Sequence, residues 1–279
     1  MHNRFVDSLQ RNNVRVLGKG PRTMILAHGF GCDQSMWRHF IPAFERDFRL
    51  VLFDYVGHGK ADASAFDRSR YATLEGYADD IVNICETLAI HDAVFVGHSV
   101  SAMIGVMALH KDPSRFSALV MVGPSPRYLD DGDYIGGFKK QDIDGLLDFL
   151  DSNFLGWSST MAPVIMGNAA RPELSEELAN SFCRTNPEIA KHFARVTFLS
   201  DNRADLPGVN VPTLILQCTE DNIAPVAVGR YVEKQIPRSK FVQLRASGHC
   251  PHLSDPEETI SSIRTFLEQE GFASQNDGR

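Results

Sequence analysis

A serine, an aspartate and a histidine (Ser99, Asp221 and His249) each come a few residues after a short run that is a candidate strand. A serine hydroxyl is a poor nucleophile at neutral pH, so it needs a base within hydrogen-bond reach and a third group to orient that base. The carboxyl ends of parallel strands meet at one edge of a sheet, which would bring the three side chains together. The order serine, acid, histidine therefore predicts a catalytic triad for acyl transfer.

The segment 97–101, Gly-His-Ser-Val-Ser, places Ser99 between an apolar run at 93–96 and a helical pattern at 100–110. A serine in such a strand-to-helix turn is held in a strained backbone that pushes its Oγ outward. The usual pattern ends in glycine; Ser101 stands there instead and is small enough for the turn to form. Alone, the segment is weak evidence, because a serine at this place is more often a helix N-cap.

Asp221 and His249, the predicted partners of Ser99, also have alternative interpretations. Glu220 is an alternative to Asp221, although Pro225, four residues after Asp221, suits the usual loop better. Taken singly, Asp221 would be a solvated acidic turn and His249 a loop histidine. With Ser99 they favour the triad, in which Asp221 orients His249 and His249 moves the proton.

The segment 28–31, His-Gly-Phe-Gly, directly follows the apolar run 23–27. Glycines there let the backbone turn so that an amide points at a developing oxyanion. We expect the backbone N–H groups of Phe30 and Val100 to be the two donors of this oxyanion hole. The alternative is a plain turn after a strand.

Other polar motifs give weaker predictions. The run 249–252, His-Cys-Pro-His, resembles metal-ligand spacing, but no further ligands cluster with it, so we expect no metal. Cys32 is interpreted as a small buried side chain and not as a reactive thiol. Gly-His-Gly at 57–59 lacks the spacing of a dinucleotide site and predicts a turn. No cofactor is expected.

Apolar runs alternate with helical patterns and predict the elements that position these residues. Helical patterns include 73–88 and 100–110, and a last helix begins with Asp255 as its cap. The candidate strands are 13–17, 23–27, 50–53, 93–96, 118–122, 213–217 and 240–244. This alternation predicts an α/β fold whose mostly parallel central sheet is flanked by helices on both sides.

The alternation stops between about 126 and 206, where no convincing strand occurs. Amphipathic patterns there predict helices at 141–154, 158–166, 172–182 and 187–199. We therefore expect a helical lid at 127–206 inserted into a core made of 1–126 and 207–279. An insertion at the carboxyl edge of a parallel sheet lies over the crevice where such sheets bind ligands.

Length and composition exclude several classes of protein. The 279 residues are 43% hydrophobic and 23% charged, which argues against a disordered or fibrous chain. The net charge of −7, with its charges spread along the sequence, argues against binding of nucleic acid or of an anionic membrane. Five cysteines without a Cys-x-x-Cys, no signal-peptide stretch in residues 1–13 and no membrane-length apolar run lead us to expect a cytoplasmic protein with reduced thiols.

Six stretches are similar to one known group: 29–35 (GFGCDQS), 52–57 (LFDYVG), 96–100 (VGHSV), 120–126 (VMVGPSP), 216–218 (LQC) and 248–252 (GHCPH). Together they resemble the RsbQ-like subfamily of α/β-hydrolases, which includes a bacterial stress-response regulator and is related to the plant strigolactone and karrikin receptors. The stretch 97–105 is equally similar to the plant receptors, and His28 and Ser101 match them. The similarity extends roughly from 12 to 267.

The resemblance implies an α/β-hydrolase fold with a four-helix lid over a mostly apolar pocket. It also implies that hydrolysis serves signalling, with a butenolide-type ligand in the plant proteins and a sensor-phosphatase partner in the RsbQ-like ones. From the residues alone, aromatic side chains in the insertion are sufficient to line such a pocket. They are Phe138, Trp157, Phe182, Phe193 and Phe198. The alternative is that they only pack the lid helices together.

The function predicted from the sequence is hydrolysis of a small apolar ester or butenolide-type lactone by a serine hydrolase, in an RsbQ-like signalling role. The alternative is a general metabolic carboxylesterase without a signalling partner. Serine at position 99 argues against haloalkane dehalogenases and epoxide hydrolases, which place an aspartate there.

Overall fold

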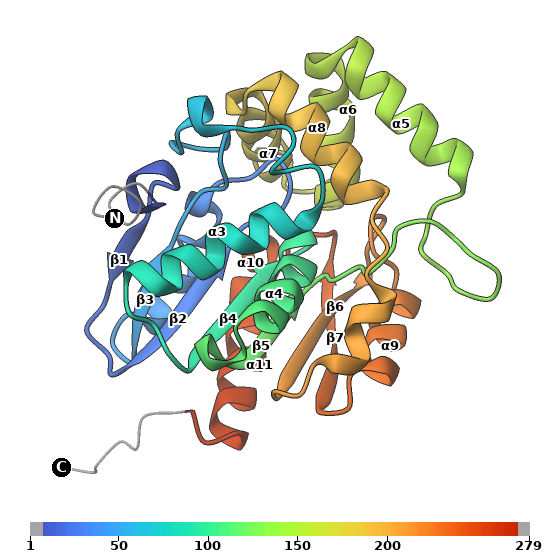
Figure 1. The fold of residues 1–279 in the computed structure, drawn as a ribbon. Helices are drawn as coiled ribbons and strands as arrows, with labels where there is room; N and C mark the ends of the chain where they lie inside the picture. Colours follow the sequence, from blue (N-terminus) through green and yellow to red (C-terminus); the bar gives the residue numbers. More distant parts are fainter. Residues whose placement is uncertain (1–7, 273–279) are drawn as a thin grey trace.

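A seven-stranded sheet forms the centre of the computed structural model, which describes residues 8–272 (Figure 1). The strand order is β1-β3-β2-β4-β5-β6-β7; β1 pairs antiparallel with β3, and all other neighbours are parallel. The strands are β1 (Arg15–Leu17), β2 (Arg22–Ala27), β3 (Phe48–Leu52), β4 (Ala93–His98), β5 (Phe116–Val122), β6 (Thr213–Glu220) and β7 (Ser239–Ser247). This confirms the predicted mostly parallel sheet.

Both faces of the sheet are buried because successive side chains of a strand point to opposite faces. The helices flanking the sheet are α2 (Phe40–Phe44), α3 (Leu74–Thr87), α4 (Val100–Lys111), α9 (Val226–Gln235), α10 (Pro251–Ser254) and α11 (Pro256–Gln269).

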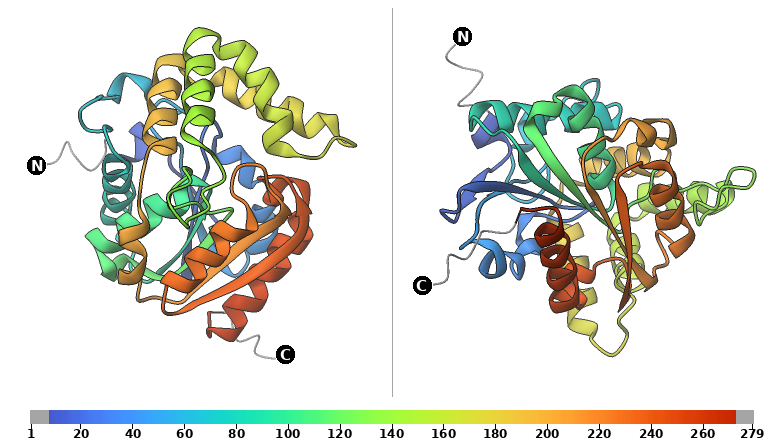
Figure 2. Two further views of the ribbon diagram at one scale, coloured as in Figure 1. Left: turned by 90° about the vertical axis from the view of Figure 1, so that its right-hand side faces the viewer. Right: turned by 90° about the horizontal axis from the view of Figure 1, so that it is seen from below.

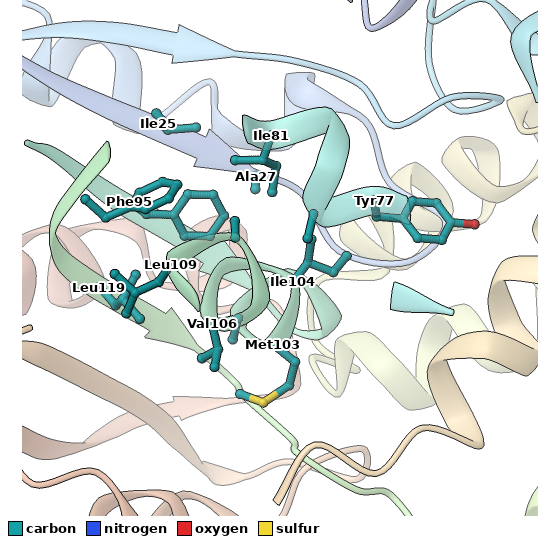
Figure 3. Close-up of a cluster of buried hydrophobic side chains, with 14 of the residues drawn as sticks. Ile25, Ala27, Tyr77, Ile81, Phe95, Met103, Ile104, Val106, Leu109 and Leu119 are labelled. Atoms are coloured by element: carbon teal, nitrogen blue, oxygen red, sulfur yellow. The ribbon is translucent and has the colours of Figure 1, made fainter. Parts of the chain in front are cut away.

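The side chains of β2 illustrate the two cores. Ile25 and Ala27 contribute to the core beneath α3, α4 and α9, whereas Met24 and Leu26 contribute to the core beneath α2 and α11. Figure 3 shows part of the first core, with Tyr77 and Ile81 of α3 close to side chains of β2, β4 and α4.

Four helices form a lid between β5 and β6: α5 (Lys140–Ser152), α6 (Phe154–Met166), α7 (Pro172–Arg184) and α8 (Pro187–Phe198). The lid lies beyond the carboxyl ends of the strands, at the top of Figure 1 and of the left view of Figure 2. Its helices begin at predictable signals: proline stands in the first turn of α7 and of α8, and the Asn153 side chain accepts the Gly156 N–H at the start of α6. The predicted helical insertion is confirmed.

The remaining expectations concern the ends of the chain, the cysteines and membrane helices. The ends of the predicted core, 1–7 and 273–279, lie outside the described residues. All five cysteines are unpaired; four are buried and Cys183 is exposed. Within residues 8–272, no helix combines the length and the apolar character that a membrane crossing requires.

Candidate active site

Ser99 occupies the turn between β4 and α4, in a backbone conformation of φ 57° and ψ −125°. Such a conformation is unfavourable for a residue with a side chain and persists only where the surroundings impose it. The Ser99 N–H donates to the Val122 carbonyl (2.8 Å), which ties the turn to the end of β5. A Cβ at Gly97 would lie 2.6 Å from the Ser101 carbonyl oxygen, so glycine is required at this strand position.

The imidazole of His249 bridges Ser99 and Asp221. His249 Nε2 lies 2.8 Å from Ser99 Oγ, and His249 Nδ1 lies 2.7 Å from Asp221 Oδ2. The N–H of His249 therefore belongs on Nδ1, facing the carboxylate, and the lone pair on Nε2 faces the serine hydroxyl. The side chains of His249 and Asp221 are almost fully buried. This is the arrangement in which histidine accepts the proton of a serine nucleophile.

Asp221 is fixed by further hydrogen bonds to its carboxylate. Oδ1 accepts the backbone N–H groups of Ile223 (2.8 Å) and Ala224 (3.0 Å), and Oδ2 also accepts the Gln217 amide (3.2 Å). Glu220, the alternative acid, is exposed and its carboxylate lies 3.5 Å from the Ser247 hydroxyl. The structure therefore places Asp221, not Glu220, beside His249.

Behind the triad, His98 donates its Nε2–H to the His249 carbonyl (2.8 Å). Burial and the neighbouring His249 lower the pKa of His98 to about 3, so that its ring is neutral. The His252 ring packs on His98 with a centroid separation of 4.4 Å, and burial also holds the pKa of His252 well below its usual range. His98 and His252 were not singled out from the sequence for this place, because nothing in their spacing shows that they pack together.

The loop at 28–31 lies directly against the nucleophile. A Cβ at Gly29 would stand 2.5 Å from His98 Nδ1 and 3.3 Å from Ser99 Cβ, so only glycine allows this approach. In the part of the chain that the structure describes, the Phe30 and Val100 N–H groups donate to no other residue. Phe30 belongs to this loop, and Val100 is the first residue of α4, next to Ser99.

A small apolar cavity of about 30 Å³ opens above Ser99. That volume is enough for about two water molecules. Its walls come from the core and from the lid helices α6, α7 and α8. The lining residues are Phe30, Cys32, His98, Ser99, Tyr128, Ile165, Leu178, Phe182, Thr197, Phe198, Ile223, His249 and Cys250.

The five aromatic residues predicted to line the pocket divide into two groups. Phe182 and Phe198 line the cavity. Trp157 stands behind it, with its ring centroid 5.1 Å from that of Phe182, and Phe193 stacks on Tyr77 at 4.4 Å in the core. The Phe138 ring lies 6.5 Å from that of Phe198, outside the lining. Phe138, Trp157 and Phe193 are not among the residues that line this cavity, and each contacts another aromatic ring, as in the alternative of packing.

Tyr128 is a site residue that the sequence reasoning missed. Its hydroxyl lies 3.5 Å from Ser99 Oγ, and burial raises its pKa to about 12, so it remains a neutral donor. It lies in the loop after β5, at the same sheet edge as the triad. The sequence signal that could have identified Tyr128 is its position a few residues after the predicted strand 118–122, at the sheet edge where the triad residues gather.

The weaker motifs have structural roles. Gly57-His58-Gly59 forms a turn, with positive φ at both glycines. Cys32 and Cys250 are buried thiols whose pKa burial raises, which makes them poor nucleophiles. Among residues 8–272, no group of three or more His, Cys, Asp or Glu side chains is arranged to hold a metal ion.

Comparison with known proteins agrees with this geometry. The model of the alpha/beta hydrolase family matches residues 24–262. The karrikin insensitive 2 receptor CA of Petunia hybrida is 41% identical over 90% of this chain and 93% of its own, and the strigolactone esterase D14 of Arabidopsis thaliana is 39% identical over 93% and 97%. The solved structure of a hydrolase from Oleispira antarctica matches with a TM-score of 0.92 and 40% identity, over 95% of this chain and 97% of that one.

The chain therefore belongs to the alpha/beta hydrolase family. Within it, the chain is a member of the group of strigolactone- and karrikin-receptor-like hydrolases, to which it is about 40% identical along most of its length. With serine, histidine and aspartate in hydrogen-bond contact, the protein is a serine hydrolase.

Proposed function

We propose that this protein hydrolyses a small apolar ester or a butenolide-type lactone, with Ser99 as nucleophile, His249 as general base and acid, and Asp221 as the group that orients His249. The observation that carries this proposal is the 2.8 Å contact between Ser99 Oγ and His249 Nε2 at the floor of an apolar cavity.

In the first step, Ser99 Oγ attacks the carbonyl carbon while its proton moves to His249 Nε2. The negative charge that develops on the carbonyl oxygen is held by the N–H groups of Phe30 and Val100. Collapse of the tetrahedral intermediate breaks the bond to the leaving alkoxide, which takes the proton from His249. Water then cleaves the acyl-enzyme by the same path and restores Ser99.

The lining of the cavity and the names of two relatives support this ligand class. Phe30, Phe182 and Phe198 favour an apolar ligand, and the buried walls offer few polar groups to bind a charged one. One relative bears the name strigolactone esterase and another that of a karrikin insensitive receptor. Strigolactones contain a butenolide ring, which is an ester that a serine nucleophile can open.

The test is intact-protein mass spectrometry with a synthetic strigolactone-type butenolide, on wild type, Ser99→Ala and His249→Ala. We expect ligand cleavage and a covalent adduct in wild type only. In hydrolysis of p-nitrophenyl acetate, Ser99→Ala should lower kcat at least about 1000-fold. Full activity of Ser99→Ala would contradict the mechanism. Rapid turnover of p-nitrophenyl esters without cleavage of the butenolide would favour a general carboxylesterase.

We further infer that hydrolysis serves a signalling role, as the resemblance to the RsbQ-like proteins implies, with a phosphatase that carries a sensor domain as partner. This role would be supported if a gene next to the one for this protein encodes such a phosphatase and if the phosphatase co-purifies with the wild-type protein. Failure of the two proteins to associate when both are present, with and without ligand, would contradict it.

A further inference from the structure

A closed ring of hydrogen bonds joins His28, Tyr55 and Ser101, three residues from separate elements. His28 follows β2, Tyr55 follows β3 closely, and Ser101 lies in the first turn of α4. The Ser101 hydroxyl lies 2.5 Å from the His28 carbonyl oxygen and 2.7 Å from the Tyr55 hydroxyl, and the Tyr55 N–H lies 3.2 Å from His28 Nε2. All three residues are fully buried, so water cannot replace a partner that is lost.

The direction of each proton in this ring follows from the chemistry of the groups. A carbonyl only accepts, so the Ser101 hydroxyl donates to the His28 carbonyl, and the Tyr55 hydroxyl must then donate to Ser101. His28 Nε2 accepts the Tyr55 backbone N–H, so the imidazole proton of His28 is on Nδ1. That N–H donates to the Gly29 carbonyl at 2.9 Å. Burial lowers the pKa of His28 and keeps its imidazole neutral, as the acceptor role of Nε2 requires.

The ring connects the two elements that bear the proposed oxyanion donors. Phe30 is two residues from His28 along the loop, and Val100 is adjacent to Ser101 on α4. We propose that Tyr55 and Ser101 are positioning residues, which hold the loop and the helix at the separation that lets both N–H groups reach one oxyanion. The hydroxyl at position 101, where the usual pattern has glycine, thereby gains a function. This inference rests on the proposed function and adds to it the residues that align the oxyanion hole.

The experiment compares Tyr55→Phe and Ser101→Ala with a matched control, Tyr77→Phe. Tyr77 is buried in the same aromatic cluster, with its ring 5.6 Å from that of Tyr55, but its hydroxyl has no hydrogen-bond partner among the described residues. Competent sites are counted by titration with a serine-reactive phosphonate, so that partial unfolding of a variant does not lower the measured kcat. We expect Tyr55→Phe and Ser101→Ala to lower kcat about 10- to 100-fold with little change in KM, and Tyr77→Phe to leave both parameters unchanged.

A second readout separates alignment of the oxyanion hole from general stability. A trifluoromethyl ketone adds to Ser99 and forms an oxyanion, so its affinity should fall by the same factor as kcat in Tyr55→Phe and Ser101→Ala. Because both variants interrupt one chain of donors, the double variant should be no slower than Ser101→Ala alone. These results would support the proposal.

Two outcomes would overturn it: kcat of Tyr55→Phe within twofold of wild type, or equal losses in Tyr55→Phe and Tyr77→Phe. The variant Ser99→Ala, measured in the same assay, keeps this failure separate from failure of the proposed function. An active wild type with an inactive Ser99→Ala preserves the triad mechanism even when the Tyr55 result removes the positioning role.

Discussion

The backbone N–H of His249 donates a hydrogen bond to the carbonyl of Ile165, in the last turn of lid helix α6 (2.8 Å). Residues on either side of this hydrogen bond also join the lid to the loop that bears His249. The Asn168 amide donates to the Ser247 carbonyl (2.9 Å), and Gly248 lies so close to α6 that a Cβ there would stand 1.8 Å from the Met166 carbonyl oxygen. The end of a lid helix is therefore part of the support of the proposed catalytic base.

A methyl group at position 248 should disturb this support. We expect Gly248→Ala to separate α6 from the histidine loop and to lower kcat at least about 10-fold, because a displacement of His249 by a fraction of an ångström weakens its contact with Ser99. The matched control is Gly132→Ala, since Gly132 also has positive φ (58°) but nothing lies within 4 Å of its Cβ position. Steady-state kinetics and circular dichroism on both variants test this, and equal kinetics would contradict it.

The choice of Asp221 over Glu220 can be tested by amide substitution. Asp221→Asn removes the acceptor of the His249 Nδ1–H bond and favours the wrong tautomer, so kcat should fall about 10⁴-fold. Glu220→Gln alters an exposed carboxylate and should retain wild-type kinetics. Loss of activity in the Glu220 variant, with activity kept in the Asp221 variant, would reverse the assignment.

Cavity lining can be distinguished from packing by acyl-chain selectivity. Phe182 lines the cavity, whereas Phe193 is buried against Tyr77 and does not line it. We expect Phe182→Leu to raise kcat/KM for a butyrate ester relative to an acetate ester by about 10-fold, since each methylene accommodated in an apolar pocket has an effect of that order. Phe193→Leu should change stability but not this ratio. An unchanged ratio in Phe182→Leu would show that the side chain does not limit the acyl group.

Buried histidines make the stability of the fold depend on pH. Burial lowers the pKa of His58 to about 3, while an unfolded chain binds that proton near 6.5. Between these values the unfolded state holds more protons, so the free energy of unfolding rises with pH from about 3 to 6.5 and is fully present above 6.5. The slope for one such group is at most about 1.4 kcal/mol per pH unit.

We expect His58→Phe to reduce the dependence of unfolding free energy on pH between 4.5 and 6.5 relative to wild type. Urea unfolding at a series of pH values measures it, and the slope, not the absolute stability, is the quantity compared. His58 packs between His28 and Phe193, so the phenyl ring occupies an aromatic environment. An unchanged slope would mean that His58 is protonated equally in both states.

The sheet and the triad were predictable from the sequence because their signals are local. Several strands are nearly continuous apolar runs, and Ser99, Asp221 and His249 each come a few residues after a predicted strand. Helix α9 (Val226–Gln235) was not predicted, because its Gly229 and three valines disfavour a helix. A tertiary contact explains why glycine occupies this helical position, because a Cβ at Gly229 would lie 2.6 Å from the Phe241 ring.

The pocket was less predictable, because its lining depends on how the lid helices rotate. Phe193 and Phe198 are both on α8, yet one stacks on Tyr77 and the other lines the cavity. Tyr128, in the loop after β5, and His98, the last residue of β4, both contact triad residues that are distant in the sequence or that no periodic pattern places beside them. Such contacts arise from the packing of distant segments, which the order of residues alone does not give.

The bond between Ser99 and His249 joins residues 150 positions apart, and Asp221 is on a third strand end. Their contact requires β4, β5, β6 and β7 to have paired in register, and all four lid helices lie in the chain between β5 and β6. Refolding from denaturant should therefore restore helical circular dichroism before it restores ester hydrolysis. The rate at which ester hydrolysis recovers would therefore report the last long-range step of folding. A nascent chain would have no hydrolase activity until the segment bearing His249 has left the ribosome.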